Sequence, residues 1–109
     1  MDERHQRKPR LERELQRILN IIKRDYRPQK VILFGSLCHN KVSALSDIDL
    51  FIVKDSKKRY LDRIDEFMDL VKPKVAVDVF IYTPKELKKN DSYIEGILKR
   101  GKLLYERKS

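Results

Sequence analysis

The sequence has little cysteine and no long apolar stretch. Its only cysteine is Cys38, so an internal disulfide is excluded and a reducing compartment is favoured. No run approaches the roughly 18 to 20 apolar residues that a membrane helix needs. The first residues also lack the apolar segment of a secretory signal. We therefore expect a cytoplasmic protein without a membrane segment.

Repeats, linkers and low-complexity blocks are absent as well, and 109 residues suffice for one domain. The formal net charge is +9, and charged residues make up 39% of the chain. This balance favours anionic partners such as nucleic acid, a nucleotide or an acidic protein, but a well-solvated surface explains it equally well. We do not expect nucleic acid as a specific ligand, because that role would rest on charge alone.

The periodicity of apolar residues predicts alternating helices and strands. The polar, unpatterned start predicts a flexible basic arm at 1–8 and a folded domain at 9–109, with a helix from Pro9 that ends before Pro28. Later elements are strands at 30–34, 48–53 and 75–82, helices at 56–71 and 92–100, and an edge strand at 102–105. This order predicts an α/β (α+β) fold, a small mixed sheet packed on helices as one pair of layers.

Three helices have more specific signals. Ser56 is placed to cap the helix at 56–71. Thr83-Pro84-Lys85-Glu86 has a capping residue, a proline at the first helical position and a glutamate three residues on, which predicts a capping box. In the helix at 92–100, the spacing predicts an inward face of Tyr93, Ile94, Ile97 and Leu98.

Three aspartates lie in or beside the predicted strands. Asp47 and Asp49 head an apolar run, and alternate residues of a strand face the same way, so they are neighbours. Asp78 lies inside the apolar run 75–82, where a buried carboxylate is costly unless a cation or donors replace water. A hard divalent ion would remove the repulsion between such groups. If Asp78 approaches from the next strand, the three would hold two Mg²⁺ ions roughly 4 Å apart, the spacing of two-metal phosphoryl chemistry.

These aspartates have a catalytic and a structural interpretation. In the first, one ion holds a nucleoside triphosphate, the other lowers the pKa of an attacking hydroxyl, and Asp78 accepts its proton. In the second, Asp47 caps a turn, Asp49 is solvated at the strand end, and Asp78 pairs with a lysine or arginine.

Gly35-Ser36 follows the strand predicted at 30–34. A glycine lets backbone N–H groups approach a phosphate, a helix beginning at Ser36 would point its positive end there, and the Ser36 hydroxyl can donate to a phosphate oxygen. A plain strand-to-helix turn is the commoner meaning of such a pair, and the P-loop sequence is absent. Beside the aspartates, however, Gly35 and Ser36 are predicted to bind nucleotide.

The segment GSLCHNKVSALSDIDLFIV, followed by VDVFIY, resembles the minimal nucleotidyltransferases of the DNA polymerase β superfamily. The pattern is Gly-Ser, ten residues, Asp-x-Asp and a third acid on a later strand, which here are Gly35, Ser36, Asp47, Asp49 and Asp78. The resemblance implies magnesium-dependent transfer of a nucleoside monophosphate, usually AMP from ATP, to a hydroxyl.

The resemblance also implies a partner. Many such small proteins are antitoxins encoded beside a HEPN-type RNase toxin, and some add AMP to a tyrosine of that toxin. The alternative is an antitoxin that neutralises its partner by complex formation, with the site retained but idle. Because the chain lacks room for an acceptor-binding domain, we expect a partner protein or a homo-oligomer to complete the pocket. Family members often carry Arg-Gly where this chain has His39-Asn40.

Three further groups have both a functional and a structural interpretation. Cys38-His39 suggests zinc only weakly, because no other ligands accompany the pair. Lys57-Lys58-Arg59 could bind an anion, although a solvated charged face is the simpler interpretation. Tyr82, Tyr93 and Tyr105 are interpreted as core or rim aromatics, and one of them could stack on a nucleotide base.

Overall fold

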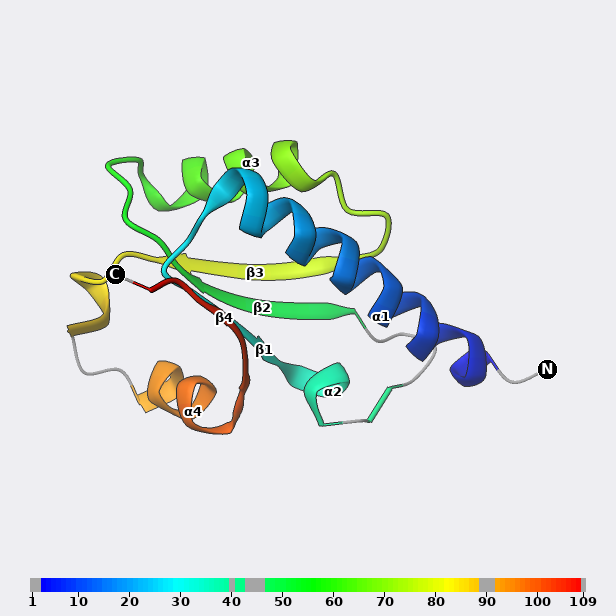
Figure 1. Cartoon of the computed structure of the whole chain (residues 1–109). Helices are drawn as coiled ribbons and strands as arrows, with labels where there is room; N and C mark the ends of the chain where they lie inside the picture. The colour runs from blue at the N-terminus through cyan, green and yellow to red at the C-terminus, as the bar shows by residue number, and fades with distance from the viewer. Residues whose placement is uncertain (1–2, 40, 43–46, 89–91, 109) are drawn as a thin grey trace.

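The chain folds into a four-stranded sheet with helices on both faces (Figure 1). The computed structural model describes residues 3–39, 41–42, 47–88 and 92–108. In chain order the elements are α1 (Glu3–Ile21), the π-helical turn η1 (Ile22–Tyr26), β1 (Lys30–Phe34), α2 (Gly35–Cys38), β2 (Ile48–Val53), α3 (Tyr60–Val71), β3 (Val77–Tyr82), the 3-10 turn η2 (Glu86–Lys88), α4 (Ser92–Arg100) and β4 (Lys102–Glu106). The predicted α+β class is confirmed.

The strand order is β3-β2-β1-β4, with β3 and β4 at the two edges. β1 runs antiparallel to β2 and to β4, whereas β2 and β3 are parallel and are joined through α3. A parallel pair needs such a crossover, because the chain must return to the same end of the sheet. The predicted mixed sheet is therefore present.

Each face of the sheet has its own apolar core. On one face, α1 and α3 cover side chains such as Leu50 and Ile52 of β2. On the other, Ile94 and Ile97 of α4 belong to a smaller cluster with the alternate β2 residues Phe51 and Val53. The prediction of one pair of layers is wrong, because a strand that is apolar on both sides needs cover on both sides.

Local stop signals placed several boundaries correctly. β1 and β2 have the predicted bounds, and β1 ends where Gly35 takes a positive φ of 78°. Before β1, Arg27 adopts the left-handed conformation and donates its N–H to the Ile22 carbonyl, and Pro28 follows. Gly101 donates to the Ile97 carbonyl between α4 and β4. Glycine and proline restrict the backbone locally, so they can be interpreted without knowing the fold.

The first helix is longer than predicted. It begins at Glu3, and Pro9 lies inside it rather than at its start. A proline within a helix removes one hydrogen bond. The preceding residues include glutamate, arginine, glutamine and lysine, which have high helix propensity. The prediction that the helix begins at Pro9 rested on the apolar pattern, which reports burial rather than helix formation.

The helix at 56–71 is shorter than predicted. α3 begins at Tyr60, and no side chain caps it. The Ser56 hydroxyl instead accepts a hydrogen bond from the Lys58 N–H at 3.1 Å, so it stabilises the turn before the helix. Serine is common in both settings, and the sequence alone does not separate them.

α4 spans the predicted residues, but the side chains that it buries against the sheet differ from the predicted ones. Ile94 and Ile97 are buried, whereas Tyr93 is 62% exposed and Leu98 is 37% exposed. Four neighbouring apolar positions are more than one helix face can bury against a small sheet.

The expected loop after α2 includes residues 40 and 43–46, which lie outside the described residues. Within the part of the chain that is described, no helix has both the length and the apolar character needed to cross a membrane.

A cluster of carboxylates at the end of the sheet

The structure brings together the three aspartates that the sequence singled out. Asp47 directly precedes β2, Asp49 lies in β2, and Asp78 is the second residue of β3. Asp49 and Asp78 are register partners across the parallel pair. One carboxylate oxygen from each of the three residues lies within 4.8 Å of the others. We call Asp47, Asp49 and Asp78 the carboxylate cluster.

Gly35 lies directly against this cluster. Its φ of 78° is in the left-handed region, and a Cβ built on it would overlap Oδ2 of Asp49. The position therefore needs glycine both for its backbone and for its close approach to the carboxylate. Ser36 follows in α2, which begins one residue earlier than predicted and forms only a single turn. Such a short helix has only a small dipole. The groups that can bind a phosphate here are therefore the backbone N–H groups and the Ser36 hydroxyl.

Burial and mutual repulsion act together on these acids. Burial raises the pKa of Asp49 to about 7, and the neighbouring Asp47 and Asp78 contribute to that rise. Burial and then Asp78 also raise the pKa of Asp47. Among the ion pairs of the described residues, none involves the cluster. A hard divalent ion such as Mg²⁺ binds carboxylate oxygens that are not paired with a basic side chain. The three carboxylates therefore fit that ion.

Asp78 corrects part of the sequence argument. The apolar run predicted a buried strand, but β3 is an edge strand that begins at Val77. Val79 and Ile81 are buried, whereas Asp78 itself is exposed. The burial cost assigned to Asp78 falls instead on Asp49 in the inner strand. The alternative that Asp78 pairs with a basic side chain is not seen among the ion pairs of the described chain.

Aromatic rings border the cluster on the α4 side of the sheet. Phe34 is the register partner of Asp49, and its ring stacks on that of Phe80, with centroids 5.8 Å apart. Phe80 also meets the edge of Tyr93 at 6.3 Å. The other tyrosines considered from the sequence lie elsewhere: Tyr82 contacts Phe51 and Tyr60, and Tyr105 lies near Lys23.

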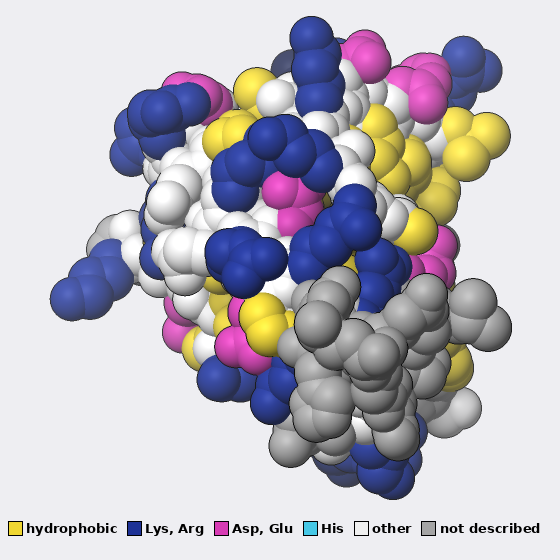
Figure 2. Space-filling model, turned by 90° about the vertical axis from the view of Figure 1, so that its right-hand side faces the viewer, with side chains coloured by type: hydrophobic (Ala, Val, Ile, Leu, Met, Phe, Trp, Pro, Cys, Tyr) yellow, Lys and Arg dark blue, Asp and Glu magenta, His cyan; other side chains and the backbone are white. Residues whose placement is uncertain are grey.

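Figure 2 views the end of the molecule where β1 passes into α2, the right-hand side of Figure 1. Lys and Arg side chains are spread over this face, and an acidic patch lies among them near its centre. With a formal net charge of +9, the surrounding field attracts anions. An anionic substrate is therefore drawn toward a face that also presents acidic groups.

The other predicted groups have ordinary structural roles. Lys58 pairs with Glu66 at 2.6 Å and Arg59 with Asp62 at 3.3 Å, which supports the charged-face interpretation of Lys57-Lys58-Arg59. Among the described residues, the carboxylate cluster is the one group of three metal-binding side chains, so Cys38-His39 forms no such site. His39 is exposed, and the expected turn at Asn40 lies outside the described residues.

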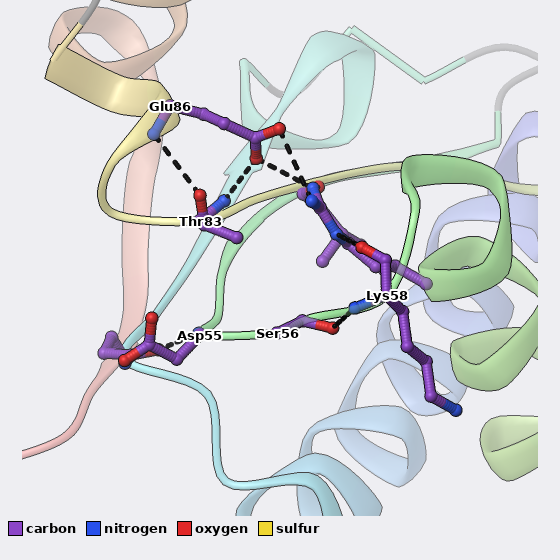
Figure 3. A network of polar contacts seen from close by, with 8 residues as sticks. Asp55, Ser56, Lys58, Thr83 and Glu86 are labelled. Carbon is purple, nitrogen blue, oxygen red and sulfur yellow. Dashed lines mark hydrogen bonds and ion pairs between the residues drawn. The ribbon is translucent and has the colours of Figure 1, made fainter.

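Sequence reasoning missed a buried arginine. Arg63 of α3 is 7% exposed, donates to the Ile81 carbonyl at 3.0 Å and pairs with Glu86 at 2.7 Å. Figure 3 shows the predicted capping box beside it: Glu86 accepts from the Thr83 N–H, and Thr83 accepts from the Glu86 N–H. Arg63 lies one turn from Phe67 on the inner side of α3, and that spacing was its only signal.

Comparison with known proteins agrees with this geometry. The fold and the site describe an α+β domain with a mixed sheet and three clustered aspartates at one end of that sheet. The family model described as polymerase beta, nucleotidyltransferase matches residues 16–109. The chain therefore belongs to the polymerase beta nucleotidyltransferase family.

One solved structure supports the fold independently. A candidate nucleotidyltransferase from Sulfolobus solfataricus is 19% identical, with a TM-score of 0.64, and the match covers 98% of this chain and 90% of that one. At this identity the likeness shows the fold alone. No curated protein matches the chain.

Proposed function

We propose that this chain is a magnesium-dependent enzyme that transfers a nucleoside monophosphate, AMP from ATP, to a hydroxyl acceptor. The observation that carries the proposal is the carboxylate cluster, whose oxygens lie within 4.8 Å of one another without a basic partner among the described ion pairs. Membership of the polymerase beta nucleotidyltransferase family supports the reaction class.

The residues have distinct roles in this proposal. Asp47, Asp49 and Asp78 would hold Mg²⁺, which when bound supplies positive charge to the triphosphate and to the attacking hydroxyl. Gly35 leaves room for Asp49 and keeps the turn open to a phosphate. The Ser36 hydroxyl donates to a phosphate oxygen.

Asp78 is the proposed proton acceptor. It is the exposed member of the cluster and lies on an edge strand, where an acceptor can approach. The hydroxyl oxygen forms a bond to the α-phosphorus, and its proton moves to an Asp78 carboxylate oxygen. The bond from the α-phosphorus to the bridging oxygen breaks, and pyrophosphate leaves with that electron pair.

The resemblance to minimal nucleotidyltransferases extends the proposal to a partner. We propose that the acceptor is a tyrosine hydroxyl of a HEPN-type toxin and that the chain acts as its antitoxin. An antitoxin that acts by occlusion alone is the competing explanation.

Transfer of label from α-³²P-ATP tests the enzymatic proposal. With Mg²⁺ and a HEPN-type protein encoded beside this chain, we expect labelled partner. Asp49→Asn should reduce transfer at least about 100-fold, because altering even groups that support metal ligands commonly costs 10- to 100-fold. The matched control is Asp65→Asn, on the exposed side of α3, which should leave transfer unchanged. Transfer that survives Asp49→Asn, or no transfer together with no magnesium-dependent ATP binding, would contradict the proposal.

Neutralisation of the toxin separates catalysis from occlusion. Asp78→Asn should abolish protection of cells if transfer is the mechanism. If the variant binds the partner and still protects, occlusion is the mechanism. Complex formation is measured in parallel by size-exclusion chromatography.

A further inference from the structure

Three aromatic side chains form a continuous surface beside the carboxylate cluster. We call Phe34, Phe80 and Tyr93 the aromatic ledge. Phe34 ends β1, Phe80 lies in β3, and Tyr93 is the second residue of α4. The three come from separate elements, so the surface exists only in the folded chain.

The inner part of the ledge covers the strand that carries Asp49. β1 and β3 flank β2, yet the rings of Phe34 and Phe80 stack with centroids 5.8 Å apart. The register pairs Phe34 with Asp49, and Phe51 with Phe80. The stacked rings therefore span β2 between Asp49 and Phe51. The carboxylate cluster has an apolar wall on this side.

Tyr93 extends the wall into solvent. It is 62% exposed, while the edge contact to Phe80 at 6.3 Å holds its ring against the sheet. The apolar spacing of α4 predicted that Tyr93 would be buried, and the structure leaves its surface accessible instead. An aromatic ring already packed on one side can bind a planar group with little loss of conformational entropy.

We propose that the aromatic ledge is the platform on which the nucleobase of the donor nucleotide stacks, with Tyr93 as the contacting ring. The inference rests on the proposed function, since it assumes that the triphosphate lies at the carboxylate cluster. Tyr93 then contributes affinity for the nucleoside part, and base identity matters little because every base has a stacking face.

Binding with and without a base isolates this contribution. We compare the α,β-methylene analogue of ATP with inorganic tripolyphosphate, each with Mg²⁺, by calorimetry. Wild type should bind the nucleotide analogue more tightly. Tyr93→Ala should weaken binding of the analogue about 5- to 150-fold, the range of one base–aromatic stack, without changing tripolyphosphate binding. Tyr93→Phe should bind like wild type, because the ring is retained.

Leu61→Ala is the control, since Leu61 is 73% exposed on α3, which packs on the opposite face of the sheet. It should change neither ligand. Asp49→Asn should weaken both ligands, which separates loss of the phosphate site from loss of the base platform.

A spectroscopic readout is available because the chain contains no tryptophan. Tyr93→Trp places a single fluorophore on the ledge, and the nucleotide analogue should quench it whereas tripolyphosphate should not. Leu61→Trp should respond to neither.

The outcomes separate the two proposals. If wild type binds both ligands equally, or if Tyr93→Ala leaves the nucleotide affinity unchanged, the ledge is not the base platform and the proposed function survives. If wild type binds neither ligand, both proposals fail. Unquenched Tyr93→Trp at saturating nucleotide would also overturn the ledge.

Discussion

Two carboxylates that are withdrawn from solvent have opposite surroundings. Glu14 in α1 is 6% exposed and accepts hydrogen bonds from the Arg17 guanidinium at 2.7 and 2.8 Å and from the Lys74 N–H. The Arg17 hydrogen bond is the main reason that the pKa of Glu14 is lowered. Asp49 is half-buried among Asp47 and Asp78, and its pKa is raised to about 7.

The difference separates an acid that stabilises the fold from acids that destabilise it. A buried charge is tolerable when a counter-charge and donors replace water, as at Glu14. Around Asp49, each neighbouring charge adds repulsion, so the metal-free fold loses free energy at this point. Natural chains accept such a cost at sites that bind a ligand, which is why the cluster and not Glu14 is the functional candidate.

The largest effect should come from breaking the cluster through Gly35→Ala. The new Cβ would overlap Oδ2 of Asp49, and a φ of 78° is unfavourable for alanine. Backbone strain of this kind costs about 1–3 kcal/mol of unfolding free energy, and displacement of Asp49 should also reduce transfer at least about 100-fold. Urea denaturation and label transfer measure the two losses.

Gly96→Ala is the control for that substitution. Gly96 lies in α4, and its new Cβ would meet only the end of the flexible Arg100 side chain. Alanine should stabilise the helix by about 0.5–1 kcal/mol and leave transfer unchanged. Equal behaviour of the two variants would mean that Gly35 has no special role.

Glu14→Gln should remove the ion pair between Arg17 and Glu14, the stabilising acid of the two compared above. It removes the charge that pairs with Arg17, which retains its hydrogen bonds to the Val71 and Lys72 carbonyls. Because Arg17 is partly exposed, we expect a loss of about 2 kcal/mol, below the 3–5 kcal/mol of fully buried pairs. Urea denaturation measures it, and transfer by the folded variant should be normal. If the variant is fully folded and transfer is still reduced, Glu14 is not purely structural, and the distinction between Glu14 and the carboxylate cluster is wrong.

The sharpest contrast between the two acids is in the pH dependence of stability without metal. The folded-state pKa of Asp49, about 7, lies above the ordinary aspartate value of 3.8, so the folded state binds more protons between these values. Stability should therefore fall as pH rises from about 4 to 7, by at most about 1.4 kcal/mol per pH unit, and Asp49→Asn should flatten this slope. Glu14 has the opposite sign: its contribution is complete above the ordinary glutamate pKa of 4.5 and is lost as pH falls through the lower folded-state pKa.

Urea denaturation in EDTA at several pH values measures both slopes. Added Mg²⁺ should raise the stability of wild type more at pH 7 than at pH 5, because the metal competes with the proton on Asp49. A wild-type slope between pH 4 and 7 that Asp49→Asn leaves unchanged would show that another group is responsible.

The sequence predicted the strands and the cluster because their signals are local. Gly35 and Pro28 bound β1, and the Asp-x-Asp spacing places two acids on one face whatever the fold. The third acid also required that β3 lie beside β2, which the apolar run does not indicate and which the structure supplies. The resemblance then supplied the reaction class.

The errors concern contacts between distant parts of the chain. Whether Asp78 is buried depends on how far α4 extends over β3, and whether Tyr93 faces inward depends on the same packing. Arg63 and Glu86 are 23 residues apart, so no local pattern pairs them. The extra residues of α1 before Pro9 follow from propensity, which the apolar pattern does not report.

The position of β3 at the margin of the sheet has a consequence for the proposed acceptor. Within the described part of the chain no further strand lies beyond Asp78, so the proposed proton acceptor is open to solvent on that side. A folded macromolecule can reach such a position without threading a side chain through a channel. In this proposal, the open site admits large acceptors as readily as small ones. The choice between acceptors must therefore come from surfaces outside the reaction centre.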